Sequence, residues 1–238
     1  MGEIHIKDLY CVLMKNNLGN VKECKTLIKH HHVKVNGQMI DNIRYKVHEN
    51  DIILVDENQV SSQPFVYYML NKPKGYVCAN KDKYNMCVVD LIKKDCFCIG
   101  RLDKDTTGLL LLSNDSSLSK KLLMPQFHVE KTYLVKTLKR LSDSLVERFK
   151  EGIIIDDDVK CQSAVLSIID DYHCYVTLHE GKFHQVKKMF LSCDNLVVEL
   201  KRISFGGILL DEALAEGEYR SLTKEEFHKL KEPLKISI

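Results

Sequence analysis

The 238-residue sequence has no tryptophan, no long apolar run and almost no excess of one charge. No stretch approaches the ~18 consecutive apolar residues of a membrane span, so we expect a soluble, cytoplasmic protein with no membrane partner. Lys and Arg number 35 against 33 Asp and Glu, a net charge of +2, which excludes a global basic field for a nucleic-acid partner. Any such surface must come from local clustering of basic side chains.

The nine cysteines lack the spacing of a metal site. Metal ligation by cysteine usually needs a Cys-x-x-Cys pair joined by a second pair. Here Cys96 and Cys98 form the only close pair, and their alternation around Phe97 is typical of a strand. Because the number is odd and no secretory signal is present, we expect free thiols in a reducing cytosol and no bound metal.

The first 60 residues predict a small domain of their own. Periodicity and turn residues indicate two helices, a hairpin and a strand, over 8–16, 21–31, 33–40 and 52–55. The polar segment 57–64, which ends in Ser-Ser-Gln-Pro, is typical of a linker. We therefore expect one domain over 1–60 and a second over 61–238.

The second part alternates strands with short helices. We expect strands over 65–70, 97–100, 109–113, 129–138, 163–169, 174–179 and 197–203. We expect helices over 116–123, 142–151 and 184–192, and a last helix that begins with the capping box at Thr223. Because several strands follow one another without a helix between them, the sequence predicts an α+β fold with a mostly antiparallel sheet.

Basic residues cluster on the second predicted helix. Lys22, Lys25 and Lys29 share one helix face, and His30 to His32 and Lys34 continue this surface into the hairpin. Phosphate binding needs such local density of positive charge, but a solvated lysine face has the same pattern. The spacing alone leaves both interpretations open.

The order of elements in residues 1–60 resembles the S4 RNA-binding domain: a helix, a basic helix, a Val-x-Val-Asn-Gly hairpin and an Asp-x-Ile-x-Val strand. This resemblance implies that Lys22, Lys25, Lys29 and Lys34 bind RNA. The sequence departs from the usual domain because residues 20–25 replace the Ser-Arg pair that opens the second helix. Residues 1–60 also hold eight basic and eight acidic residues, so we expect weak RNA affinity from this part.

A polar loop that leads into an apolar strand lies at residues 100–115. Gly100 and Gly108 allow a tight turn and a close backbone approach, and Asp103 and Asp105 lie where chemistry is often placed, at a strand–loop junction. Asp and Thr are also ordinary turn residues that cap their own backbone. Spacing alone does not decide between a turn and a site.

The amino-acid sequence of this loop resembles the signature of the RsuA-like pseudouridine synthases, Gly-Arg-Leu-Asp-x-x-Thr-x-Gly-Leu-Leu-Leu-Leu. Three further segments resemble the same family in the same order: Asn-Lys-Pro-Lys-Gly at 71–75, Glu-Lys-Thr-Tyr at 130–133 and Glu-Gly-Lys-Phe-His-Gln-Val-Lys-Lys-Met at 180–189. The resemblance covers essentially the whole chain and implies the pseudouridine synthase fold. It implies that Asp103 is the essential catalytic residue, with Tyr133 and Lys187 beside it.

The implied reaction breaks the N1–C1′ bond of a uridine, turns the uracil and rejoins it through C5. The carboxylate of Asp103 would act at the ribose of a flipped-out uridine, either at C1′ or by removing the C2′ proton. Lys187 would keep this carboxylate ionised, and Tyr133 would offer the base a flat face and a hydroxyl. Arg101, Lys182 and Lys188 are expected to bind RNA, although Arg101 could equally pair with a neighbouring acid. The reaction is an isomerisation, so no cofactor is expected.

Within the family the motifs are most similar to the small-subunit members, which implies ribosomal RNA as partner and one uridine of 16S rRNA as substrate. The sequence leaves open whether the enzyme reaches this RNA as free rRNA or within an assembling small subunit. The same reaction on 23S rRNA is the alternative. A non-catalytic RNA-binding protein and a glycoside hydrolase that uses Asp103 and Asp105 are further alternatives. Intact Asp103, Tyr133 and Lys187 disfavour the first, and the S4-like part and the absence of tryptophan for sugar stacking disfavour the second. We expect a monomer.

Overall fold

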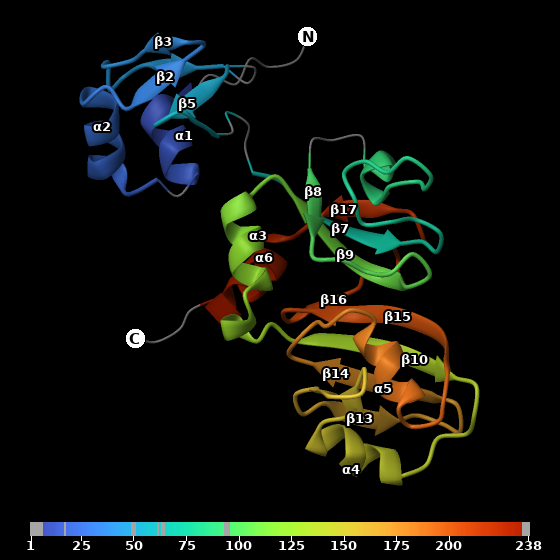
Figure 1. Ribbon diagram of the computed structural model, residues 1–238. Helices are drawn as coiled ribbons and strands as arrows, with labels where there is room; N and C mark the ends of the chain where they lie inside the picture. Colours follow the sequence, from blue (N-terminus) through green and yellow to red (C-terminus); the bar gives the residue numbers. More distant parts are fainter. Residues whose placement is uncertain are drawn as a thin grey trace. The chain divides into compact units, whose positions relative to one another are not determined.

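A computed structural model describes residues 7–16, 18–48, 51–60, 62, 65–92 and 96–234. The chain forms two compact units that divide between Phe65 and Val66, a few residues after the boundary expected near residue 60. Three residues of the expected linker, 61, 63 and 64, lie outside the described residues. Figure 1 colours the chain from end to end. No helix of the described residues has the length and apolar character needed to cross a membrane.

The first unit packs two helices against a small antiparallel sheet of order β3–β2–β5–β6, and a second pair, β1–β4, lies beside it. Its elements are β1 (Lys7–Asp8), α1 (Leu9–Lys15), α2 (Val21–Lys29), β2 (Val33–Val35), β3 (Gln38–Met39), β4 (Lys46–Val47), β5 (Ile53–Val55) and β6 (Asn58–Val60). The two helices, the hairpin and the strand expected here are confirmed.

Two details of the first unit explain its sequence. Asn20 caps α2 by accepting hydrogen bonds from the N–H groups of Lys22 and Glu23, at 2.9 and 3.1 Å, so it replaces the usual serine without loss of the cap.

The linker expected from residue 57 is wrong at its start, because β6 pairs with β5. Asp56 and Glu57 adopt the left-handed conformation of a two-residue hairpin turn. The resulting strand is mostly exposed and therefore polar.

The second unit is built on a nine-stranded sheet of order β13–β14–β10–β15–β9–β7–β17, with β16 on β15 and β8 on β9. Its strands are β7 (Tyr67–Lys72), β8 (Phe97–Ile99), β9 (Thr107–Ser113), β10 (Lys131–Thr137), β13 (Val165–Ile168), β14 (His173–Leu178), β15 (Val197–Phe205), β16 (Ile208–Leu209) and β17 (Tyr219–Ser221). Every pairing in it is antiparallel except that of β9 with β15. The α+β class with a mostly antiparallel sheet is confirmed.

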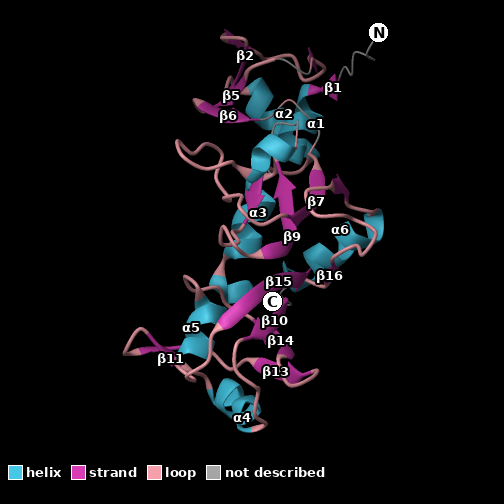
Figure 2. Cartoon of the chain, turned by 90° about the vertical axis from the view of Figure 1, so that its right-hand side faces the viewer, coloured by secondary structure: helices cyan, strands magenta, loops and turns pink. Residues whose placement is uncertain are grey.

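Helices cover the two halves of this sheet separately (Figures 1 and 2). The helices are α3 (Ser116–Leu123), α4 (Ser144–Glu151), α5 (Gln185–Leu191) and α6 (Lys224–Lys231), with short 3-10 turns at Val88–Leu91, Pro125–Phe127 and Glu232–Leu234. A small hairpin, β11 (Ile154–Ile155) and β12 (Val159–Lys160), stands apart from the sheet. α4 and α5 bury one core with β10, β13, β14 and β15, while α3 and α6 bury a second with β7, β9 and β16.

The two halves of the sheet join at the parallel pair of β9 and β15. This pair has only two register positions, Lys201 opposite Thr107 and Arg202 opposite Gly108. Gly108 has a φ of +97°, and a Cβ there would lie 2.3 Å from the carbonyl oxygen of Arg202. The glycine is therefore required for the close approach that brings the loop before β9 against β15.

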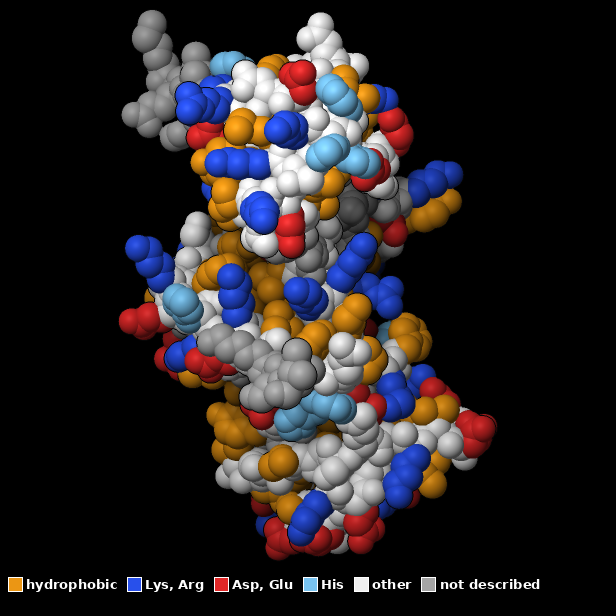
Figure 3. All heavy atoms as spheres, turned by 90° about the vertical axis from the view of Figure 1, so that its left-hand side faces the viewer, with side chains coloured by type: hydrophobic (Ala, Val, Ile, Leu, Met, Phe, Trp, Pro, Cys, Tyr) orange, Lys and Arg blue, Asp and Glu red, His pale blue; other side chains and the backbone are white. Residues whose placement is uncertain are grey.

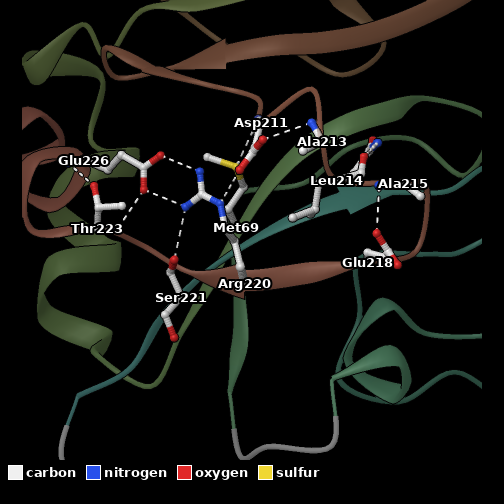
Figure 4. Close-up of polar contacts among 11 residues, drawn as sticks. Met69, Asp211, Ala213, Leu214, Ala215, Glu218, Arg220, Ser221, Thr223 and Glu226 are labelled. Carbon is white, nitrogen blue, oxygen red and sulfur yellow. Dashed lines mark hydrogen bonds and ion pairs between the residues drawn. The ribbon is translucent and has the colours of Figure 1, made fainter.

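The last helix is fastened to the sheet edge through Arg220 on β17 (Figure 4). The Arg220 guanidinium donates from Nε to Asp211 at 2.6 Å and from Nη1 and Nη2 to the two oxygens of Glu226, each at 2.8 Å. Glu226 also belongs to the capping box that begins at Thr223. This network raises the pKa of Arg220 and lowers those of both carboxylates, first through the hydrogen bonds themselves.

Candidate active site

A cleft of about 1330 Å³ opens on the second unit where the two halves of the sheet meet. It is lined by the loop before β9, the floor strands β10 and β15, the segment between β14 and α5, the turn after β7 and the end of α3. In residues, the lining is 77–80, 82, 97–98, 100–106, 122–125, 129, 131, 133, 162, 178–186, 200, 202 and 205. Side chains that lie far apart in the sequence therefore share one concave surface.

Asp103 lies in this cleft between two positive or potentially positive groups. Lys187 Nζ, from α5, is 3.0 Å from Asp103 Oδ2, and His184 Nε2 is 3.5 Å from Asp103 Oδ1. Lys187 Nζ also lies 2.6 Å from Asp105 Oδ1. The structure thus brings Asp103 and Lys187 together as the sequence indicated. Burial lowers the pKa of Lys187, but the two carboxylates outweigh it and raise this pKa overall.

Asp105 is the more exposed of the two carboxylates, with 58% of its side chain accessible against 26% for Asp103. Burial acts to raise the pKa of Asp105, but the hydrogen bond and the charge of Lys187, with a backbone hydrogen bond and the charge of Lys74, together outweigh it and hold the pKa below its usual range. Lys187 therefore remains charged and bridges the two carboxylates, and Asp103 is the one held deeper in the cleft.

Buried Lys72, at the end of β7, is hydrogen-bonded to the backbone of the loop before β9. Its Nζ donates to the carbonyl oxygens of Pro73 and Thr106 at 3.0 and 2.9 Å. The Gly75 N–H donates to the Lys104 carbonyl at 2.7 Å. Burial lowers the pKa of Lys72, an effect that Cys78, Asp105 and Asp103 partly oppose. The segment 71–75 was recognised in the sequence, but this use of Lys72 was not.

Cys78 supports the same loop from the side. The Leu102 N–H, one residue before Asp103, donates to Cys78 Sγ at 3.3 Å. The hydrogen bond from the Cys98 thiol, helped by that of Leu102 and opposed by burial, lowers the pKa of Cys78 to about 6. Nothing in the spacing of the cysteines indicated this pair.

We expect Cys78 to react with iodoacetamide at neutral pH much faster than Cys193. Both thiols are partly exposed, but burial raises the pKa of Cys193, whereas hydrogen bonding lowers that of Cys78 to about 6 and so favours its reactive thiolate form. Peptide mapping by mass spectrometry after brief alkylation measures the ratio. Equal rates at the two cysteines would contradict the hydrogen bonding at Cys78.

Tyr133 lies on the floor of the cleft, on β10. It is paired across the sheet with Arg202 of β15 and Val176 of β14. Its half-buried ring packs against two hydrophobic cores at once, and it lines the cleft together with Leu178 and Leu200. The structure therefore places Tyr133 in the cleft that holds Asp103.

The other residues expected to bind RNA in this unit differ in whether an acidic side chain already pairs with them. Arg101 is exposed, lines the cleft and forms no ion pair or hydrogen bond within the part of the chain that the structure describes. Lys182 is paired with Glu180 and Lys188 with Asp156. Arg101 is therefore the most available cation at the rim.

The predicted basic surface of the first unit is present but uneven. Lys22 and Lys29 are exposed on α2, Lys25 Nζ lies 4.7 Å from the centre of the Tyr10 ring, and Lys34 is paired with Glu57. Figure 3 shows lysine, arginine and histidine side chains gathered over this unit with a few acids among them. The four lysines are not equally available for a phosphate.

Sequence reasoning missed Phe183 and His184, which directly precede α5. The two rings stack with centroids 3.8 Å apart, and Phe183 is 69% exposed. Lys188 Nζ lies 5.1 Å from the centre of the Phe183 ring. The exposed ring of Phe183 stacks on His184, which contacts Asp103. Such an exposed aromatic face near the carboxylate suits stacking on an unpaired base. The signal in the sequence was the Phe-His pair inside a recognised motif.

No group of three His, Cys, Asp or Glu side chains within the described ranges could hold a metal ion. The polar groups around Asp103 instead include a lysine that bridges two carboxylates, a histidine and, in the same cleft, a tyrosine. Such a set can act on a sugar–base bond through charge and proton transfer within the chain.

Comparisons with known proteins agree with this geometry. The RNA pseudouridylate synthase family matches residues 66–192, and the S4 domain matches residues 15–53. A Bacillus subtilis RNA pseudouridine synthase, YtzG, is 38% identical over 93% of this chain and 97% of its own length. Ribosomal small subunit pseudouridine synthase A is 38% identical in Escherichia coli over 84% of this chain and 89% of the relative. The same enzyme of Haemophilus influenzae is 40% identical over 83% and 88%.

A crystal structure of a pseudouridylate synthase superposes with a TM-score of 0.69 at 35% identity, over 93% of this chain and 98% of that one. The fold, the cleft and these matches thus define an RNA-modifying isomerase that an S4 domain precedes in the sequence. The chain belongs to the RNA pseudouridylate synthase family. The resemblance seen in the sequence is confirmed, and an enzyme is supported over both the non-catalytic RNA-binding protein and the glycoside hydrolase.

Proposed function

We propose that this enzyme converts one uridine of 16S ribosomal RNA to pseudouridine, with Asp103 acting at the ribose of the flipped-out nucleotide. The observation that carries the proposal is the position of Asp103 in the cleft, between Lys187 at 3.0 Å and His184 at 3.5 Å. A carboxylate so placed, with a tyrosine in the same cleft, matches the needs of chemistry at C1′ or C2′ of a sugar.

Each neighbouring residue has a distinct task in this reaction. Lys187 forms an ion pair with Asp103, and the two carboxylates of Asp103 and Asp105 keep Lys187 charged. Tyr133 supports the uracil ring and brings a hydroxyl toward the position where C5 loses its proton. Arg101 contacts the RNA beside the flipped nucleotide, because flipping leaves a gap in the stack that a side chain can fill. Lys182 and Lys188 contact the backbone at the α5 side of the cleft.

The domains divide the work in the same proposal. Residues up to about 60 bind RNA through Lys22, Lys25, Lys29 and Lys34, and the remainder carries out the isomerisation. Because Lys34 is paired with Glu57, we expect a small contribution from the first domain. We expect a monomer that acts in the cytoplasm on the assembling small subunit.

The choice of 16S rRNA is supported by the relatives named ribosomal small subunit pseudouridine synthase A. The purified enzyme should form one pseudouridine in a 16S transcript, or in a small-subunit assembly intermediate, and none in a 23S transcript. Chemical mapping of pseudouridine in each RNA measures this. Modification of 23S rRNA alone would overturn the substrate assignment, and no pseudouridine in any of the three would overturn the proposed function.

A further inference from the structure

Two positive side chains on the floor of the cleft have no acidic partner. Arg202 is 2% exposed, and its Nε donates to the Leu109 carbonyl at 2.7 Å, but its Nη2 is buried without a hydrogen-bond partner in the described structure. Lys131 Nζ donates to the Val129 carbonyl at 2.7 Å. Among the described residues, neither side chain has an ion pair within 4 Å.

The sheet register places both groups beside Tyr133. Arg202 on β15 lies directly opposite Tyr133 on β10. Lys131 precedes Tyr133 by two positions, so both side chains project from the same face of the strand. Lys131 Nζ and the Arg202 guanidinium carbon lie 5.7 and 5.1 Å from the centre of the Phe205 ring. All four side chains line the cleft.

A structural role explains only part of this arrangement. The bond from Arg202 Nε ties β15 to β9, but a buried charged N–H without an acceptor destabilises the folded state. Burial, and then the charge of Arg202, lower the pKa of Lys131 to about 8, although Glu180 acts in the opposite direction. Two neighbouring cations without an ion-pair partner among the described residues suit a site where negative charge develops.

The proposed reaction produces such a charge. When the C1′–N1 bond breaks, its electron pair stays on N1, and conjugation spreads the negative charge over the O2 and O4 oxygens of the uracil. This holds whether Asp103 bonds to C1′ or removes the C2′ proton. C5 then bonds to C1′, as the Asp103 carboxylate leaves C1′ or as the proton returns from Asp103 to C2′, and the uracil becomes neutral. The negative charge reappears on the ring when the C5 proton leaves to water, and N1 then takes up a proton.

We propose that Arg202 and Lys131 stabilise the detached uracil anion by donating hydrogen bonds to one of its carbonyl oxygens. This inference rests on the proposed function of the cleft and adds two catalytic residues to it. No proton is transferred by either group, because each acts through its charge and its N–H donors. The unpaired Nη2 of Arg202 finds its acceptor only once a uridine is bound beside Tyr133.

Single-turnover kinetics with excess enzyme and a short substrate RNA separate binding from chemistry. Lys131→Met should slow pseudouridine formation by about 10- to 100-fold, in the range of a lost anion-stabilising donor, while the Kd for RNA changes less than about twofold. Lys131→Arg should restore most of the rate. Lys136→Met is the matched control, because Lys136 lies on the same strand but pairs with Glu199 outside the cleft. Arg202→Gln should behave as Lys131→Met does, and Lys131→Met carries the test if that variant does not fold.

Two readouts respond only to a role in anion stabilisation. 5-Fluorouracil is the better leaving group, so with 5-fluorouridine as the target the loss in Lys131→Met should shrink, measured as consumption of the target nucleoside by mass spectrometry. The wild-type rate should fall as pH rises through about 8 and Lys131 loses its proton, whereas Lys131→Arg should keep its rate to higher pH. Glu180 and Arg202 are the charged groups that set this pKa, and the His179–Glu130 pair flanks them.

The outcomes separate this inference from other roles. A wild-type rate in Lys131→Met, or the same loss with uridine and 5-fluorouridine, would overturn it. If Lys131 instead bound an RNA phosphate, Lys131→Met would raise the Kd for RNA and reduce the slope of log K against log salt by about one. That result would also overturn the inference. A wild-type enzyme that makes no pseudouridine would instead overturn the proposed function itself.

Discussion

Asp103→Asn is expected to lower the rate of pseudouridine formation by about 10⁴-fold or more, the scale seen when a nucleophile or base is removed. An amide is neither a nucleophile at C1′ nor a base for the C2′ proton. Folding should survive, because the amide keeps the shape of the side chain and Lys187 retains Asp105 at 2.6 Å as a partner. We expect the free energy of unfolding to change by less than about 1 kcal/mol, and RNA binding to persist.

Asp105→Asn is the matched control, since it removes the other carboxylate that contacts Lys187 while leaving Asp103 at 3.0 Å from it. It should cost at most about tenfold in rate, the effect of a lost hydrogen bond to a charged group. Tritium release from C5-labelled RNA measures both variants, with thermal unfolding and filter binding alongside. If Asp105→Asn were the inactive variant and Asp103→Asn the active one, the assignment of the carboxylates would be reversed.

The loop that carries Asp103 and the helix α5 that faces it were predictable because their residues stand in uninterrupted motifs. Asp103 and Lys187 are 84 positions apart, yet their pairing at 3.0 Å follows once both motifs are read as parts of one site. The antiparallel sheet was predictable for a similar reason, since apolar alternation is local. Local patterns thus sufficed for the elements and for the first carboxylate–lysine contact.

The contacts that were missed depend on the tertiary fold alone. Lys72 and Cys78 hold the loop through backbone groups, and a backbone acceptor leaves no mark on the sequence. In the sequence, Arg202 looks like an ordinary basic residue of a strand. Its burial becomes evident only in the structure, where β15 pairs with β9 at this position. β6 was missed because an exposed edge strand has the composition of a linker.

Gly108→Ala is expected to destabilise the second unit by about 3 kcal/mol or more and to abolish activity with it. A positive φ of +97° already disfavours alanine by about 1 kcal/mol. The added Cβ would also lie 2.3 Å from the Arg202 oxygen and 2.9 Å from its nitrogen, both backbone atoms that cannot move without parting β9 from β15. Urea denaturation of the whole chain measures the loss.

Gly217→Ala separates the strain from the clash. Gly217 has a similar φ of +89°, but a Cβ there meets no atom within 4 Å, so only the conformational cost of about 1 kcal/mol remains. The difference between the two variants therefore measures how closely β9 approaches β15. Equal stabilities of the two variants would mean that β9 and β15 do not approach closely at Gly108. The position of Arg202 on the cleft floor would then need another explanation.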